Sequence, residues 1–181
     1  MKKTFNTKKV ALLGIFGALA LVLSFLESLL IPEIPFLPPG AKIGLSNVVT
    51  MLTASLYGFA PAMYITLLKG LFALITRGAT AALMSLSGGI LSTVGLCLMI
   101  KYEGRAFSFF GIGIVCAVLH NMGQLAAACV ITGTAMLINY GKYLLIFAIL
   151  TGSVTGLMLN VIMPRLKSVL KGMGAKSDVL T

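Results

Sequence analysis

The sequence predicts an all-α integral membrane protein, a bundle of six transmembrane helices that forms a single domain over residues 1–181. Three observations predict it: an apolar composition, a series of apolar runs of membrane-spanning length, and basic residues placed between those runs. Hydrophobic residues make up 59% of the chain and charged residues 10%, with a mean hydropathy of +1.06. A soluble domain carries about 25% charged residues. So apolar a chain is expected to use lipid as its solvent.

The apolar runs define the predicted spans. A helix that crosses the hydrocarbon core needs about 20 apolar residues. The run from 43 to 75 is too long for one crossing, and a turn at Gly58–Phe59–Ala60–Pro61 is expected to divide it into two short helices. The last span is expected to stop at Pro164, followed by a basic tail at 164–181. The predicted spans are residues 10–30, 43–57, 61–76, 79–100, 106–132 and 143–163.

The placement of basic residues supports this count. The net charge of +10 comes from residues at the chain ends and between apolar runs, which is typical of topology signals and not of a nucleic-acid partner. With six spans and a cytoplasmic amino terminus, three basic residues lie outside: Lys42, Arg77 and Lys142. Ten lie inside: Lys2, Lys3, Lys8, Lys9, Lys101, Arg105, Arg165, Lys167, Lys171 and Lys176. The expected location is therefore a cytoplasmic membrane, with both termini inside.

Lys69 falls within the third predicted span, where burying a charge costs at least about 2.5–3.5 kcal/mol. Its ammonium either reaches the membrane interface or pairs with Glu27, or it binds an anionic ligand. A second polar group, His120, Asn121 and Gln124, shares part of one helix face in the outer half of the fifth span. This group either joins helices or lines a pocket.

The segment from Pro38 to Asn47 leads from a proline-rich loop into a helix start. A helix amino terminus offers free backbone donors and partial positive charge, so with Lys42 and Arg77 nearby this outer mouth is expected to favour an anion. The alternative is an anchor at the membrane interface. Asn47 follows in the first turn of the helix and is a candidate ligand contact.

Small residues gather in the fourth span, where Ser87, Gly88 and Gly89 are expected to let a ligand or a neighbouring helix approach closely. Two pairs of small residues spaced four apart predict close helix contacts. They are Gly14 with Ala18 and Gly152 with Gly156.

Three motifs resemble those of the Gx transporter family, often labelled heptaprenyl diphosphate synthase component I, across nearly the whole chain. They are Pro39–Gly40–Ala41–Lys42–Ile43–Gly44–Leu45–Ser46–Asn47, Ser85–Leu86–Ser87–Gly88–Gly89 and His120–Asn121–Met122–Gly123–Gln124. The family is similar to the substrate-binding S components of energy-coupling factor (ECF) transporters.

The resemblance implies a six-helix membrane subunit that captures a small, anionic or polar-aromatic nutrient outside and works with a transmembrane coupling subunit and two cytoplasmic ATPases. It also implies that the loop after the first helix, here 32–39, closes over the ligand. Gly14 and Ala18, in place of the usual alanine pair, would contact the coupling subunit.

The acidic residues do not support the synthase label, because prenyl diphosphate synthesis needs carboxylates that hold magnesium against a diphosphate. The chain has four, Glu27, Glu33, Glu103 and Asp178, and they are scattered. We therefore expect neither catalysis nor a cofactor or metal in this chain. Two alternatives stay open: an accessory subunit of a prenyl diphosphate synthase, and a secondary transporter with His120 as a proton relay.

Overall fold

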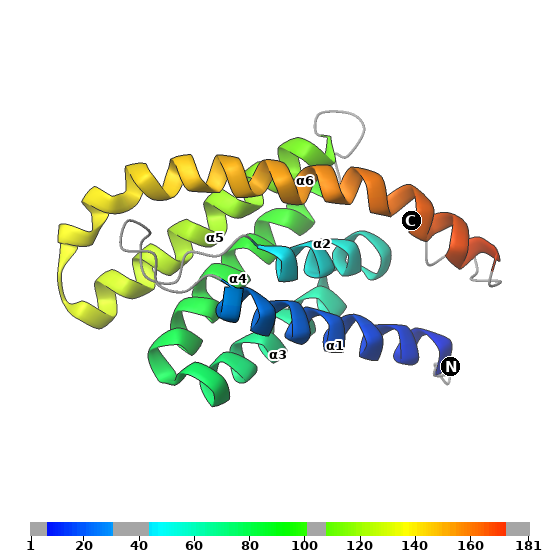
Figure 1. The fold of residues 1–181 in the computed structure, drawn as a ribbon, viewed down its shortest axis with the longest axis horizontal. Coiled ribbons are helices and arrows are strands. Elements are labelled where there is room, and N and C mark those ends of the chain that lie inside the picture. Colours follow the sequence, from blue (N-terminus) through cyan, green and yellow to red (C-terminus); the bar gives the residue numbers. More distant parts are fainter. Residues whose placement is uncertain (1–6, 31–43, 101–107, 173–181) are drawn as a thin grey trace.

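The computed structural model describes residues 7–30, 44–100 and 108–172, and these are almost entirely helical (Figure 1). The elements in chain order are α1 (Thr7–Leu30), α2 (Leu45–Tyr57), α3 (Phe59–Arg77), α4 (Ala79–Ile100), α5 (Phe109–Thr132), a short 3-10 helix η1 (Ala135–Tyr140) and α6 (Gly141–Gly172). The start of α1 and the end of α6 lie at the same end of the bundle (Figure 1). The all-helical prediction is confirmed for the described residues.

Five helical segments of the described chain are long and apolar enough to cross a membrane. They are Lys9–Leu29, Phe59–Arg77, Ala79–Ile100, Phe109–Thr132 and Ala135–Gly172. Large apolar side chains such as Ile75 and Val130 are more than 80% exposed on their outer faces, an arrangement that lipid stabilises and water does not. The chain is a multi-pass membrane protein.

The remaining apolar helix, α2, has 13 residues, and at 1.5 Å per residue it is about 20 Å long. That is shorter than the hydrocarbon core of about 30 Å. Its side chains are buried without interruption from Val48 to Ala54, because α1, α3, α4 and α6 all pack around it. Thus α2 is an inner helix that fills only part of the membrane's thickness.

The turns between α2, α3 and α4 consist of one glycine each. Gly58 and Gly78 have φ values of 82° and 87°, a region that residues with a Cβ rarely adopt. The predicted turn at Gly58 is therefore present but shorter than expected. The helix α3 already begins at Phe59, because Pro61 stands in its first turn, where a missing N–H breaks no helical hydrogen bond.

The prediction that the last helix stops at Pro164 is wrong. Pro164 lies inside α6, which continues to Gly172. The residues that follow explain why: Leu166 packs against the core and Leu170 is 2% exposed. The free energy gained by burying this apolar face offsets the loss of the helical hydrogen bond that proline cannot make.

The predicted close contact at Gly152 and Gly156 is confirmed on α6. A Cβ on Gly152 would lie 2.6 Å from the Cα of Ile114, and one on Gly156 would lie 2.8 Å from the Cα of Phe110. Gly113 on α5 completes the crossing, since its own Cβ would lie 2.5 Å from the Gly152 carbonyl oxygen. The helices α5 and α6 therefore meet backbone to backbone.

Candidate functional site

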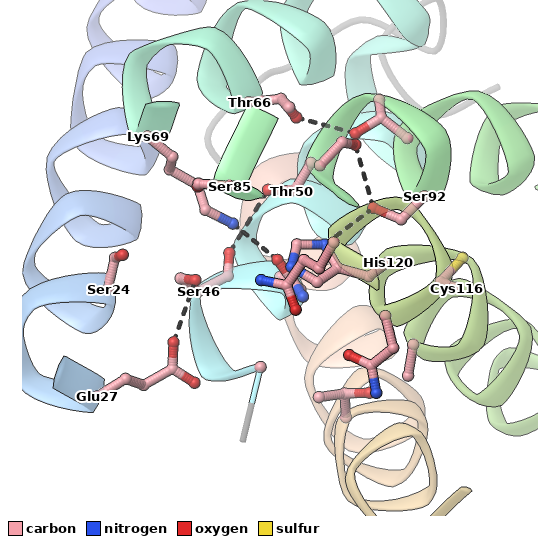
Figure 2. A pocket seen from close by; sticks show the side chains of 18 of the residues that line it. Ser24, Glu27, Ser46, Thr50, Thr66, Lys69, Ser85, Ser92, Cys116 and His120 are labelled. Carbon is pink, nitrogen blue, oxygen red and sulfur yellow. Dashed lines mark hydrogen bonds between the residues drawn. The ribbon is translucent and has the colours of Figure 1, made fainter. Parts of the chain in front are cut away.

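A polar cavity of about 520 Å³ lies between the helices, within the range typical of small-molecule sites. Every one of the six α-helices contributes polar side chains to its wall, for example Glu27, Asn47, Lys69, Ser92, His120 and Thr155. Figure 2 shows Lys69 and His120 pointing toward one another from opposite sides. Polar groups of this kind are costly inside a membrane and indicate a function.

The cavity lies away from the end of the bundle at which α1 starts and α6 ends. On α1 it is lined by Ser24 and Glu27, near the end of that helix, and on α6 by Thr151 and Thr155, in its first half. The last residue of α2, Tyr57, lies instead beside the start of α1. The Nζ of Lys9 is 5.4 Å from the centre of the Tyr57 ring. The short α2 thus lies between the cavity and the end that carries the start of α1.

Glu27 connects α1 to the amino terminus of α2. The backbone N–H of Leu45 donates to Glu27 Oε1 at 2.5 Å, and Ser46 Oγ donates to Oε2 at 3.2 Å, as Figure 2 shows for Ser46. Glu27 is 1% exposed, and Arg77 attracts it electrostatically. The amino terminus of α2, which was predicted to favour an anion, is thus occupied by the carboxylate of Glu27 from the same chain.

Lys69 and Asn47 form the next contact in the wall. Lys69 Nζ donates to Asn47 Oδ1 at 2.7 Å, which joins α3 to α2. Lys69 is 7% exposed, so its charge is held away from water. Arg77, two turns further along α3, is exposed at the edge of the same cavity. Together these two cations outnumber the single carboxylate among the described lining residues.

Two hydroxyl contacts join α4 to its neighbours α3 and α5. Thr66 Oγ1 lies 2.8 Å from Thr93 Oγ1, and its hydrogen bond to the Ala62 carbonyl identifies Thr93 as the donor between the two. Ser92 directly precedes Thr93 in α4, and its Oγ lies 3.5 Å from His120 Nδ1. The imidazole is therefore held at the cavity wall by α4.

The two amides beside His120 differ in their contacts. Asn121 Nδ2 donates to the Leu144 carbonyl on α6 at 3.1 Å, which leaves its Oδ1 as an acceptor. Gln124 is 7% exposed and lines the cavity, and its amide has no hydrogen-bond partner within the described ranges. An amide at a cavity wall is open to a hydrogen bond from a ligand or from water.

Seven of the ten residues predicted to bind a ligand line this cavity: Asn47, Lys69, Arg77, Gly89, His120, Asn121 and Gln124. Ser87 and Gly88 do not line it. Ser87 Oγ donates to the Met84 carbonyl of its own helix. A Cβ on Gly88 would lie 2.6 Å from the His120 carbonyl oxygen, so Gly88 serves the contact between α4 and α5. Lys42 and the loop 32–39 lie outside the described residues.

The proposed coupling pair occupies a different surface. Gly14 and Ala18 are both exposed on α1, and a Cβ on Gly14 would meet no atom within 4 Å. Their role in binding a partner stays a prediction.

Several lining residues were missed by sequence reasoning. Glu27 was considered only as a partner for Lys69, although a carboxylate within an apolar helix is itself a signal. Thr50, Thr151 and Thr155 also line the cavity. The spacing of four between Thr151 and Thr155 gave a signal, because it places both hydroxyls on one helix face.

The fold and the cavity together define a multi-pass membrane protein with a polar site enclosed by its helices. A family model described as heptaprenyl diphosphate synthase component I matches residues 16–162. The chain belongs to this family, also called the Gx transporter family. Searches of curated proteins and of solved structures found no match.

Proposed function

We propose that the chain is the S component of an ECF-type ABC importer, a non-catalytic subunit that captures a small anionic or polar-aromatic nutrient outside the cell. A transmembrane coupling subunit and two cytoplasmic ATPases would then drive its release inward. The observation that carries this proposal is the polar cavity, which lies between apolar helices and away from the ends of α1 and α6 that carry the basic residues.

The orientation of the cavity supports uptake. Lys9 near the start of α1 and Arg165, Lys167 and Lys171 near the end of α6 lie at one end of the bundle. An excess of basic residues favours the cytoplasmic side. In a cytoplasmic membrane the cavity would then be in the outer half of the protein, where a nutrient arrives.

The test is transport by purified components. The chain would be reconstituted in liposomes alone and with a coupling subunit and two ATPases from the same cell, and uptake of a solute that co-purifies with the chain would be measured. We expect the chain alone to bind the solute without accumulating it, and accumulation to require ATP and the other three subunits. Accumulation by the chain alone, driven by a proton gradient, would contradict the proposal.

The family name favours a second candidate, a membrane accessory subunit of heptaprenyl diphosphate synthase. The carboxylate in the cavity is already bonded to the start of α2, which supports a non-catalytic role for this chain. Adding the purified chain to a soluble prenyl diphosphate synthase and measuring product length distinguishes the two. A changed product length, together with no solute bound in the cavity, would favour the accessory subunit.

A further inference from the structure

The cavity presents cations on one side and hydrogen-bond acceptors on the other. This difference indicates which chemical class of solute can bind. On the α3 side are the cations Lys69 and Arg77. On the α5 and α6 side the wall offers acceptors. They are the Oδ1 of Asn121, one of whose two amide N–H groups donates to Leu144, and the hydroxyl oxygens of Thr151 and Thr155, whose hydrogens are donated to carbonyls of their own helix. An oxygen whose hydrogen is already donated can only accept from a ligand.

Gln124 lies on α5 with its amide in the same cavity. It is 93% buried and has no hydrogen-bond partner in the part of the chain that the structure describes. An amide offers both donors and an acceptor. It therefore suits a solute with a polar group at this part of the cavity.

The described cavity lining contains no Phe, Tyr or Trp, and its aromatic ring is the imidazole of His120. Aromatic side chains are instead exposed on the outer surface of the helices, as at Phe25, Tyr64 and Phe110. Sites for flat aromatic solutes commonly stack the solute on such rings. The wall of this cavity offers hydroxyls, amides and charges.

The charge of the wall limits the charge of the solute. Two cations face one carboxylate among the described lining residues, and that carboxylate is bonded to the amino terminus of α2. For Lys69, Arg77 and Glu27 together, the formal balance is one positive charge. A solute with one negative charge neutralises it, and of the two cations it is Lys69 that is buried.

Resting on the proposed function, we propose that this site takes a non-aromatic monocarboxylate that carries hydroxyl or amide donors. Its carboxylate lies against Lys69, and its donors face Asn121, Thr151 and Thr155. Charge-assisted hydrogen bonds to Lys69 supply the affinity for the acid group. The acceptors on α5 and α6 distinguish a hydroxylated acid from a fatty acid of similar size.

The experiment measures the unfolding temperature of the full-length chain in detergent with five probes at equal concentration. Gluconate is a hydroxylated monocarboxylate, sorbitol lacks the charge, hexanoate lacks the donors, nicotinate is aromatic, and glucose 6-phosphate is a dianion. The solute that co-purifies with the chain is identified by mass spectrometry in parallel. We expect gluconate to give the largest stabilisation and the co-purified solute to be a non-aromatic monoanion.

Two variants make the assignment specific. Lys69→Met should weaken gluconate binding at least about tenfold, as expected for the loss of a charge-assisted hydrogen bond, and leave sorbitol binding within about twofold. Lys142→Met removes a cation that is exposed outside the cavity and should leave both unchanged. If Lys69→Met does not fold, Lys69→Gln replaces it in the same comparison with Lys142→Met.

The possible failures differ. Stronger stabilisation by nicotinate, sorbitol, hexanoate or glucose 6-phosphate, or full gluconate affinity in a folded Lys69 variant, overturns the solute class and leaves a solute-binding subunit in place. Absence of any co-purified solute, together with no stabilisation by any probe, counts against the solute class and the proposed function alike.

Discussion

Lys69 on α3 and Asn47 on α2 are joined by a hydrogen bond of 2.7 Å at the wall of the cavity. The two residues are 22 positions apart in the sequence, and the bond fixes the direction of a buried ammonium group. A cation held in one position binds an anion more tightly than a mobile one, because less conformational freedom is lost on binding.

Replacing Asn47 should therefore weaken solute binding without removing the charge of Lys69. We expect Asn47→Ala to raise the Kd of the co-purified solute about tenfold, the usual loss for a hydrogen bond to a charged group. Isothermal titration on the detergent-purified chain measures this. Asn160→Ala, an exposed amide on α6, is the matched control and should keep the original Kd. Equal affinities in the two variants would remove Asn47 from the site.

The carboxylate of Glu27 should contribute to the free energy of unfolding through its two hydrogen bonds. Removing its carboxylate leaves the Leu45 N–H and the Ser46 hydroxyl without their acceptor. We expect Glu27→Ala to lower the free energy of unfolding by about 1–3 kcal/mol. Glu27→Gln, whose carbonyl oxygen still accepts from Leu45, should lose less. Thermal unfolding in detergent measures both, with Ser28→Ala on the same helix as control. An unchanged midpoint in Glu27→Ala would contradict this account.

The contact between α4 and α5 should not tolerate a side chain at Gly88. A Cβ there would lie 2.6 Å from the His120 carbonyl oxygen and 2.8 Å from Gln124 Cγ. Gly88→Ala should therefore move α5, destabilise the chain by about 1–3 kcal/mol and weaken solute binding through His120 and Gln124. In Gly111→Ala, by contrast, the new Cβ meets nothing within 4 Å. Unfolding midpoints and Kd values of the two variants test the difference.

Substitution at Gly14, which is exposed on α1 together with Ala18, should affect transport but not the binding of the solute. Gly14→Leu adds a bulky side chain where the folded chain leaves open space, so the Kd of the solute should stay the same. In liposomes with the proposed coupling subunit and ATPases, uptake should fall about tenfold or more, because the new side chain would separate surfaces that pack through small residues. Uptake equal to that of the unaltered chain would place the coupling contact elsewhere.

The predicted topology can be read from single cysteines. Lys171→Cys, near the end of α6, should react with a membrane-impermeant maleimide only after the cells are opened. Lys142→Cys, at the other end of the same helix, should react in intact cells. A background in which Cys97, Cys116 and Cys129 are replaced by serine serves as the control. The opposite pattern would reverse the orientation and place the cavity toward the cytoplasm.

Much of this architecture could be predicted because a few strong forces determine it. Apolar runs, glycine turns and scattered cations predicted the succession of helices, including a divided segment around Gly58. Pro164 misled the prediction, because its local cost is outweighed by the burial of Leu166 and Leu170, a tertiary effect that the sequence around it does not show.

The site was predictable to the extent that polar residues in a membrane segment stand out. Lys69, His120 and Gln124 were candidates for ligand contact in two separate helices, and they line one cavity. The partners of these residues were not predictable. The bonds from Glu27 to Leu45 and from Lys69 to Asn47 depend on how α1, α2 and α3 are rotated about their axes, and periodicity alone does not specify such rotations.

The burial of α2 also bears on how the protein is made. Its side chains from Val48 to Ala54 all contact protein, so this helix has no continuous face that lipid would solvate, and it is too short to cross the hydrocarbon core by itself. Three of its neighbours, α3, α4 and α6, follow it in the chain, so its burial is complete only after they have been made. Its insertion is therefore a cooperative event of several helices, and a nascent chain that ends at Tyr57 would leave α2 without its neighbours.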